Sequence, residues 1–194
     1  MSKTIEPTVL VAIVVTLLTL LWVPCAFADH CPEELVNSIR PEHQLARIDA
    51  LHDHFDRVVR LFGPPESKHE FQDESYPLGS GEAEYTWSLG DTTLDVLTVY
   101  RRNSRGKKIE AVQAVRVQGL GRSDRLITGR GIGLGDSRAQ VNATYGTTYL
   151  KGSLMNAGPE STTVTFCFED ETALEFTFDG ADRVNQIYLA SAAE

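Results

Sequence analysis

Cysteine and basic residues are both scarce in this chain of 194 residues. Lysine and arginine number 18 against 27 aspartates and glutamates, which gives a formal net charge of −9 at pH 7. Such an acidic chain repels nucleic acid and anionic lipid at long range, so neither is an expected partner. The apolar fraction of 42% is nevertheless sufficient for a packed core. We therefore expect a folded acidic protein.

The longest apolar run lies at the start of the chain, where Lys3 precedes an uncharged stretch from Val9 to Val23. Ala26-Phe27-Ala28 then supplies the small residues that a signal peptidase reads. We predict a secretory signal peptide over residues 1–28, cleaved between Ala28 and Asp29, and a mature protein in the periplasm or outside the cell. The alternative is an uncleaved membrane anchor, since a bilayer span needs about 20 apolar residues.

Only three cysteines are present, and Cys25 falls within the signal segment. The bulky Trp22-Val23-Pro24 before it does not match the small residues that precede a lipidated cysteine. The mature chain keeps Cys31 and Cys167, which in an oxidising compartment predict one disulfide. The bond would close a loop of about 136 residues and stabilise the fold by about 4–5 kcal/mol in the chain-entropy model. The alternative is a pair of separate buried thiols.

Hydrophobic periodicity predicts helices followed by strands in each half of the chain. In the first half we expect helices over residues 33–39 and 45–62, the second ended by Gly63-Pro64-Pro65, then a surface loop over 66–81 and strands over 85–89, 94–100 and 109–118. In the second half, Ser137 and Gln140 have the spacing of a capping box before a short helix that ends at Gly146. Strands are expected over 164–168, 174–178 and 184–189.

The same order of elements in both halves predicts an α+β fold built as a tandem repeat, with each helix packed on one face of its antiparallel hairpins. Residues 29–44 would form an N-terminal segment with a short helix, 45–118 the first repeat, 119–130 a linker and 131–194 the second repeat. The repeat period would be about 80 residues.

Residues 131–146 read Gly-Ile-x-Leu-Gly-x-Ser-x-x-x-Val-x-x-x-Tyr-Gly and are followed by hairpins. This segment resembles the SmpA/OmlA-type fold, which also underlies the secreted β-lactamase-inhibitor proteins. The resemblance extends over roughly residues 45–189. It implies a bacterial envelope or secreted protein that acts by binding another protein.

The sequence departs from these families in three respects. The outer-membrane assembly members are lipoproteins, whereas no lipidation site is recognisable here. The inhibitors carry a disulfide inside each repeat, whereas Cys31 and Cys167 would join the N-terminus to the second repeat. The inhibitors' docking face is rich in aromatics, whereas the strand face opposite Phe166 and Phe168 carries Thr163, Thr165, Cys167, Glu175 and Thr177.

No catalytic or metal-binding motif is recognisable. Leu78-Gly79-Ser80-Gly81 lacks the first glycine of a nucleophile elbow. The glycines at 129, 131, 133 and 135 do not have phosphate-loop spacing and are expected to form a turn. His52 and His54 lie two apart on an expected helix, so they point in different directions and cannot share a metal. Asp29-His30-Cys31 could hold copper only while Cys31 keeps its thiolate. We expect no catalytic residue, metal or cofactor.

One local cluster of charge is present in the middle of the chain. Arg101, Arg102, Arg105, Lys107 and Lys108 place five cations in one hairpin loop, where they could meet an acidic partner or anionic lipid headgroups. The alternative is a solvated loop that keeps neighbouring apolar strands from aggregating. We therefore expect a non-enzymatic exported module that binds another protein. A secreted inhibitor of a hydrolase such as a β-lactamase is a second hypothesis, and an extracytoplasmic hydrolase is a third.

The signal-peptide hypothesis predicts the N-terminus of the exported protein. After expression with its own leader in a bacterial host, intact-mass measurement should find a chain that begins at Asp29. The substitution Ala28→Leu should leave the leader attached, because the peptidase reads a small residue at this position. As a control, Phe27→Leu keeps a bulky residue between the two alanines and should be processed normally. A wild-type chain that retains residues 1–28 would support the membrane-anchor alternative.

Overall fold

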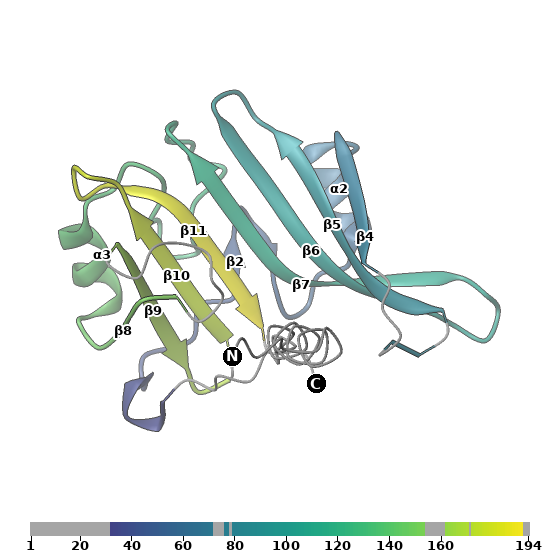
Figure 1. The fold of residues 1–194 in the computed structure, drawn as a ribbon, viewed down its shortest axis with the longest axis horizontal. Helices are drawn as coiled ribbons and strands as arrows, with labels where there is room; N and C mark the ends of the chain where they lie inside the picture. The colour runs from purple at the N-terminus through teal and green to yellow at the C-terminus, as the bar shows by residue number, and fades with distance from the viewer. Residues whose placement is uncertain (1–31, 72–75, 78, 154–161, 171, 192–194) are drawn as a thin grey trace, which may run out of the picture. The chain divides into compact units, whose positions relative to one another are not determined.

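The computed structural model describes residues 32–71, 76–77, 79–153, 162–170 and 172–191. The predicted signal peptide, its cleavage site and the Asp29-His30-Cys31 segment lie outside the described residues. Strands dominate the described part, as Figure 1 shows. In chain order the elements are the 3-10 helix η1 (Glu33–Leu35), β1 (Val36–Asn37), β2 (Gln44–Leu45), β3 (Ile48–Asp49), α2 (Phe55–Phe62), β4 (Ser67–Phe71), β5 (Ser80–Ser88), β6 (Thr92–Arg102), β7 (Lys108–Gly119), α3 (Arg138–Tyr145), β8 (Leu150–Lys151), β9 (Thr163–Phe168), β10 (Thr172–Phe178) and β11 (Val184–Ser191).

One mixed sheet of nine strands organises the described residues, in the order β1-β9-β10-β11-β7-β6-β5-β4, with β8 also paired to β9. Among the pairings of the described strands, only that of β1 with β9 is parallel. The hairpin β2–β3 forms a separate small sheet. No helix among the described residues is long and apolar enough to cross a bilayer.

The predicted α+β tandem repeat is wrong. The expected last strands of the two repeats, β7 and β11, pair with each other from Ala114 opposite Ala190 to Gln118 opposite Gln186. Both halves therefore form one continuous sheet and share one core. The described residues are mostly β and contain two short α-helices. The expected linker, residues 119–130, also takes part in the core, because Leu126 is buried and Thr128 bridges to Leu45.

The predicted helix over residues 45–62 is only partly present, since α2 begins at Phe55. Ala46 and Arg47 have positive φ angles of 55° and 64° and form the turn of the hairpin β2–β3. The Asp49 and Asp53 carboxylates accept hydrogen bonds from nearby backbone amides, a local pattern that competes with helix formation. The hydrophobic periodicity was therefore misleading in the first part of this segment, where Leu45 and Ile48 are buried in the core from the hairpin β2–β3 and not from a helix.

Two further sequence-based assignments are corrected by strand pairing. The segment expected as a helix over residues 33–39 is the 3-10 turn η1 followed by β1, and β1 obtains its backbone partners from β9. The expected surface loop over residues 66–81 contains β4 and the start of β5. Both segments are short and polar, so the pairing with a long neighbouring strand was not visible in their local sequence.

Local signals that do not depend on tertiary pairing are confirmed. Ser137 and Gln140 form the predicted capping box at the start of α3, and Gly146 ends the helix with a φ of 86°. Gly63 ends α2 in the same way, with a φ of 81°. The strands predicted over 94–100, 109–118, 164–168, 174–178 and 184–189 each cover most of an observed strand, whereas the one predicted over 85–89 covers only the last part of β5.

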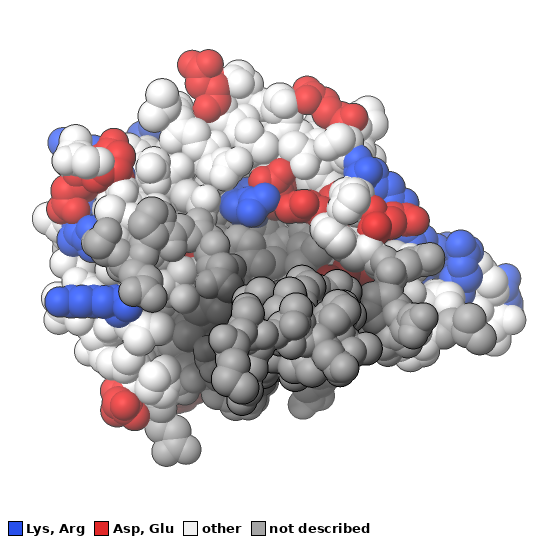
Figure 2. All heavy atoms as spheres, in the orientation of Figure 1, with Lys and Arg blue, Asp and Glu red and all other residues white. Residues whose placement is uncertain are grey.

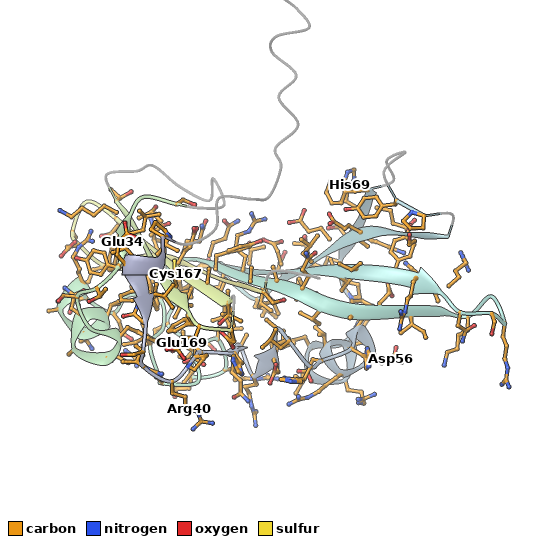
Figure 3. All side chains as sticks on the ribbon, turned by 90° about the horizontal axis from the view of Figure 1, so that it is seen from below. Glu34, Arg40, Asp56, His69, Cys167 and Glu169 are labelled. Atoms are coloured by element: carbon orange, nitrogen blue, oxygen red, sulfur yellow. The ribbon has the colours of Figure 1, made fainter. Side chains whose placement is uncertain are left out.

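Both helices lie on the same side of the sheet. Phe55 of α2 stacks on Tyr85 with ring centroids 3.8 Å apart, and Tyr145 of α3 contacts Phe166 at 5.4 Å. The register connects Tyr85 to Phe166 through directly opposed residues, so both belong to one face, here called the helix face. Figure 3 views the sheet from its edge, with Asp56 of α2 on one side and His69 of β4 on the other. The opposite face is called the polar face.

The structure places Cys167 on the polar face of β9, fully buried, as strand parity predicts. Val36 of β1 is its register partner, and Cys31 precedes Val36 by five positions in the sequence. Because β1 pairs with β9, the chain that follows Cys31 is held beside the strand that carries Cys167. Cys31 itself lies outside the described residues, and the disulfide stays a prediction.

If Cys31 and Cys167 are bonded, the denatured exported protein should bind no thiol reagent before reduction and two equivalents afterwards. The substitution Cys167→Ser should release the thiol of Cys31 and lower the free energy of unfolding by about 2–5 kcal/mol. Equal labelling with and without reductant would show two separate thiols.

Candidate functional site

The polar face carries a continuous line of polar side chains across the sheet. Register places one of them on each of six neighbouring strands, and directly opposed residues on paired strands share a face. We call this line the transverse polar row: Thr86, Asp95, Arg116, Tyr188, Glu175 and Thr165. Figure 2 shows this side of the sheet, where acidic and basic side chains lie together over its middle.

Arg116 is the charged centre of the transverse polar row. Its Nε donates to Asp95 Oδ2 at 3.0 Å, and its Nη2 donates to Glu84 Oε1 at 3.0 Å. The hydroxyl of Thr86 donates to the other Asp95 oxygen at 2.8 Å. Asp95 is only 6% exposed, so these donors compensate a carboxylate that has lost most of its water.

Glu175 is a second carboxylate of the row and is only 1% exposed. Its Oε1 accepts from Thr165 Oγ1 at 3.1 Å, and its Oε2 accepts from Ser153 Oγ at 2.8 Å. The polar side chains that the sequence placed opposite Phe166 and Phe168 are thus found on that face. They are buried, however, so they do not form a solvent-facing docking surface.

Tyr188 lies in the row between Arg116 and Glu175. The pKa of Tyr188 is raised to about 12, mainly by burial. The nearby Arg116 lowers this pKa, whereas the carboxylates of Glu175, Glu84 and Glu82 raise it. The phenol therefore keeps its proton at neutral pH. Arg116 thus pairs with Asp95, and hydroxyl groups donate to Glu175, so that both buried carboxylates favour a single strand register.

The basic hairpin comprises the end of β6, the turn over residues 103–107 and the start of β7. Of the five cations singled out in the sequence, Arg105 and Lys107 lie in the turn, Arg101 and Arg102 end β6, and Lys108 begins β7. The turn is ordered by Asn103, whose side-chain oxygen accepts from the amides of Arg105 and Lys107, both at 3.0 Å. A backbone bond from Gly106 to Asn103 and a φ of 72° at Gly106 complete the turn.

The structure divides these five cations into two groups. Lys108 is half-buried, with its ammonium 2.7 Å from Glu110, 3.1 Å from Glu70 and 3.8 Å from the centre of the Tyr100 ring. Burial opposes its charge, but Glu110 and Glu70 outweigh burial and raise the pKa of Lys108. The remaining four are exposed and form no ion pair with any described carboxylate: Arg101, Arg102, Arg105 and Lys107. Figure 2 shows Lys and Arg gathered at the end of this hairpin.

The histidines and the glycine-dense turn are occupied by structural contacts. His52 contacts the Asp49 carboxylate at 3.0 Å, and His54 Nδ1 lies 3.2 Å from the Glu110 carbonyl oxygen. The described residues contain no group of three or more histidines, cysteines or carboxylates that could hold a metal ion. In the glycine-dense turn, the amides of Arg130 and Gly133 donate to the carboxylates of Glu42 and Asp136. In a phosphate loop, such backbone amides would donate to a bound ligand. Here the amides of Arg130 and Gly133 donate to carboxylates of the protein itself.

Arg116, Asp95 and Tyr188 were not predicted from the sequence as members of one site. A signal was present, because Arg116 and Asp95 each lie between apolar residues in the middle of a predicted strand. A charge at the centre of a long strand indicates a partner on the neighbouring strand. The partner could not be named, since the pairing of β7 with β11 brings together residues that are far apart in the sequence.

No protein-family model matches the chain, and no curated protein matches it in sequence. The chain is similar to the crystal structure of a DUF4309 family protein, YjgB, from Bacillus subtilis subsp. subtilis str. 168. The two are 12% identical, the TM-score is 0.34, and the match covers 72% of this chain and 78% of that one.

The raised pKa of Tyr188 predicts a loss of stability in alkali. In the unfolded chain a tyrosine ionises near pH 10, whereas in the folded chain Tyr188 keeps its proton up to about pH 12. The folded state thus binds more protons between these values, so the free energy of unfolding falls with pH by up to about 1.4 kcal/mol per pH unit from this group. The variant Tyr188→Phe should show a correspondingly shallower fall in denaturant titrations over that range. Equal slopes for the two proteins would contradict the buried position of the phenol.

Proposed function

We propose that the protein is an exported, non-enzymatic module that binds an acidic protein partner through the tip of the basic hairpin. The observation that carries the proposal is a set of four exposed cations at the end of the hairpin: Arg101 and Arg102 at the end of β6, and Arg105 and Lys107 on the ordered turn. Lys108 is excluded from this set because Glu70 and Glu110 neutralise it. An ordered turn loses little conformational freedom on binding, which favours recognition.

The negative charge of the rest of the chain also favours binding through the hairpin. A formal charge of −9 means that most of the surface repels an acidic partner, while the hairpin attracts it. Such an asymmetry steers the encounter toward one end of the sheet and raises the association rate more than the affinity. The transverse polar row lacks this property, since its arginine is already paired with two carboxylates.

The two other hypotheses make different predictions for the same purified protein. A secreted inhibitor should block a β-lactamase or peptidase at micromolar concentration, and its activity would need a docking surface other than the buried threonines of β9 and β10. A hydrolase should turn over ester, glycoside or peptide substrates. No contact among the described residues favours either hypothesis over the binding hypothesis.

Neutralising the hairpin tests the proposal. The triple variant Arg101→Gln, Arg105→Gln, Lys107→Gln removes three exposed charges but keeps Arg102, whose guanidinium bonds the turn carbonyl of Gly106 at 3.2 Å. In pull-downs from envelope extract and culture medium, this variant should lose the partner that the wild type retains. With the recovered partner, affinity should fall by about tenfold or more at low ionic strength, and salt should weaken the wild-type complex similarly.

A matched control carries the same change in net charge elsewhere. Arg40, Arg60 and Lys151 are exposed and distant in sequence from the hairpin, and the triple change of these residues to glutamine should leave binding unchanged. A partner that is lost from both triple variants would indicate a response to net charge rather than to the hairpin. Capture that is equal for the wild type and the hairpin variant would contradict the proposal.

A further inference from the structure

The two edges of the main sheet differ in their exposure. The outer edge of β9 is covered at one end by β1 and at the other by β8. At the opposite edge lies β4, which pairs with β5 on one side and with no other described strand. All five residues of β4 are exposed, including Phe71 at 40%. An edge of this kind presents unpaired backbone groups that can bind a further strand.

The side chains of β4 restrict which strand fits there. Lys68 and Glu70 lie on the same face of the strand, and their charged atoms are 2.5 Å apart. In an antiparallel pair of two β4 strands centred on His69, Lys68 of each copy lies opposite Glu70 of the other. The four charges then form a square in which every neighbour has the opposite sign, and opposed charges across strands are stabilising. We propose that β4 is a self-complementary edge through which two copies of the chain associate.

Charge selects this register over its alternatives. A symmetric antiparallel pair must place a residue opposite itself, because opposed residues share a face. Centring the pair on Lys68 or on Glu70 would oppose like charges at the two-fold axis. Centring it on His69 opposes unlike charges, and it also pairs all five residues of β4, with Ser67 opposite Phe71. This register is therefore favoured by both charge and length.

The interface is small, so the association should be weak. Two five-residue strands bury much less than the roughly 1,200 Å² that separates weak complexes from standard ones. We therefore expect a dissociation constant of about 0.1–1 mM and a dimer that forms only at high local concentration. An extended segment of another protein is the competing occupant, and it would leave the purified chain monomeric.

Charge exchange tests the pairing in solution. The exported wild-type chain should show concentration-dependent dimerisation in sedimentation equilibrium up to about 1 mM. Lys68→Glu and Glu70→Lys, each measured alone, oppose like charges and should stay monomeric. An equimolar mixture of the two variants restores opposite charges at every position and should associate at least as tightly as the wild type.

The outcomes of this experiment are distinct. The control Arg60→Glu changes an exposed cation on α2 and should dimerise like the wild type. Association of the mixture also shows that both variants are folded, since Glu70→Lys removes the contact with Lys108. A wild-type chain that is monomeric at every concentration, or a mixture no tighter than its components, would overturn the proposal.

A cross-link tests the register independently of charge. At the two-fold axis His69 lies opposite itself at about 4.5–5.5 Å between Cα atoms, which a disulfide can bridge. His69→Cys should therefore form a covalent dimer with oxidised glutathione. Ser67→Cys should not, because two copies of Ser67 are then about 13 Å apart along the strands. Equal cross-linking of both variants would exclude the His69-centred register.

Discussion

The antiparallel pairing of β7 with β11 is the constraint on which the rest of the structure depends. On the helix face it sets Val115 beside Leu189 and Val117 beside Ile187, all fully buried. On the polar face it sets Arg116 beside Tyr188. A slip of one residue would exchange the two faces, exposing the valines and burying the guanidinium among apolar side chains. The core and the transverse polar row therefore enforce the same register from opposite sides of the sheet.

The charges of the molecule have two physical roles that follow from burial. Asp95 and Glu175 are almost completely buried, so each must be compensated inside the protein by hydrogen-bond donors, with Arg116 supplying the countercharge at Asp95. The cations at the tip of the basic hairpin keep their water, and their electrostatic field extends into solution. Buried charges thus specify the pairing of strands, while exposed ones remain available to another molecule. Both roles occur in the basic hairpin, because Lys108 is paired with Glu70 and Glu110 while the other four cations are exposed.

Much of the strand content could be predicted from the sequence, and the fold could not. β6, β7, β9, β10 and β11 show local alternation, and the capping box of α3 depends on two residues three positions apart. The hairpin β2–β3 depends instead on a core that surrounds Leu45 and Ile48, and no local pattern contains that information. The repeat hypothesis relied on the order of elements, which is compatible with two separate sheets or with one. Only the long-range pairing of β7 with β11 decides between these.

The parallel pairing of β1 with β9 has a consequence for how the sheet is completed. The side-chain amide of Asn37 on β1 donates to the carbonyl oxygen of Cys167, and these two residues lie 130 positions apart in the sequence. The hairpins of β5, β6 and β7 can form from neighbouring residues, whereas this edge of the sheet can close only when almost the entire chain is available. Because loop closure over such a distance costs entropy before the contacts are gained, folding is expected to be slow. A chain threaded through a membrane from its N-terminus would thus stay incompletely folded until its last strands had passed.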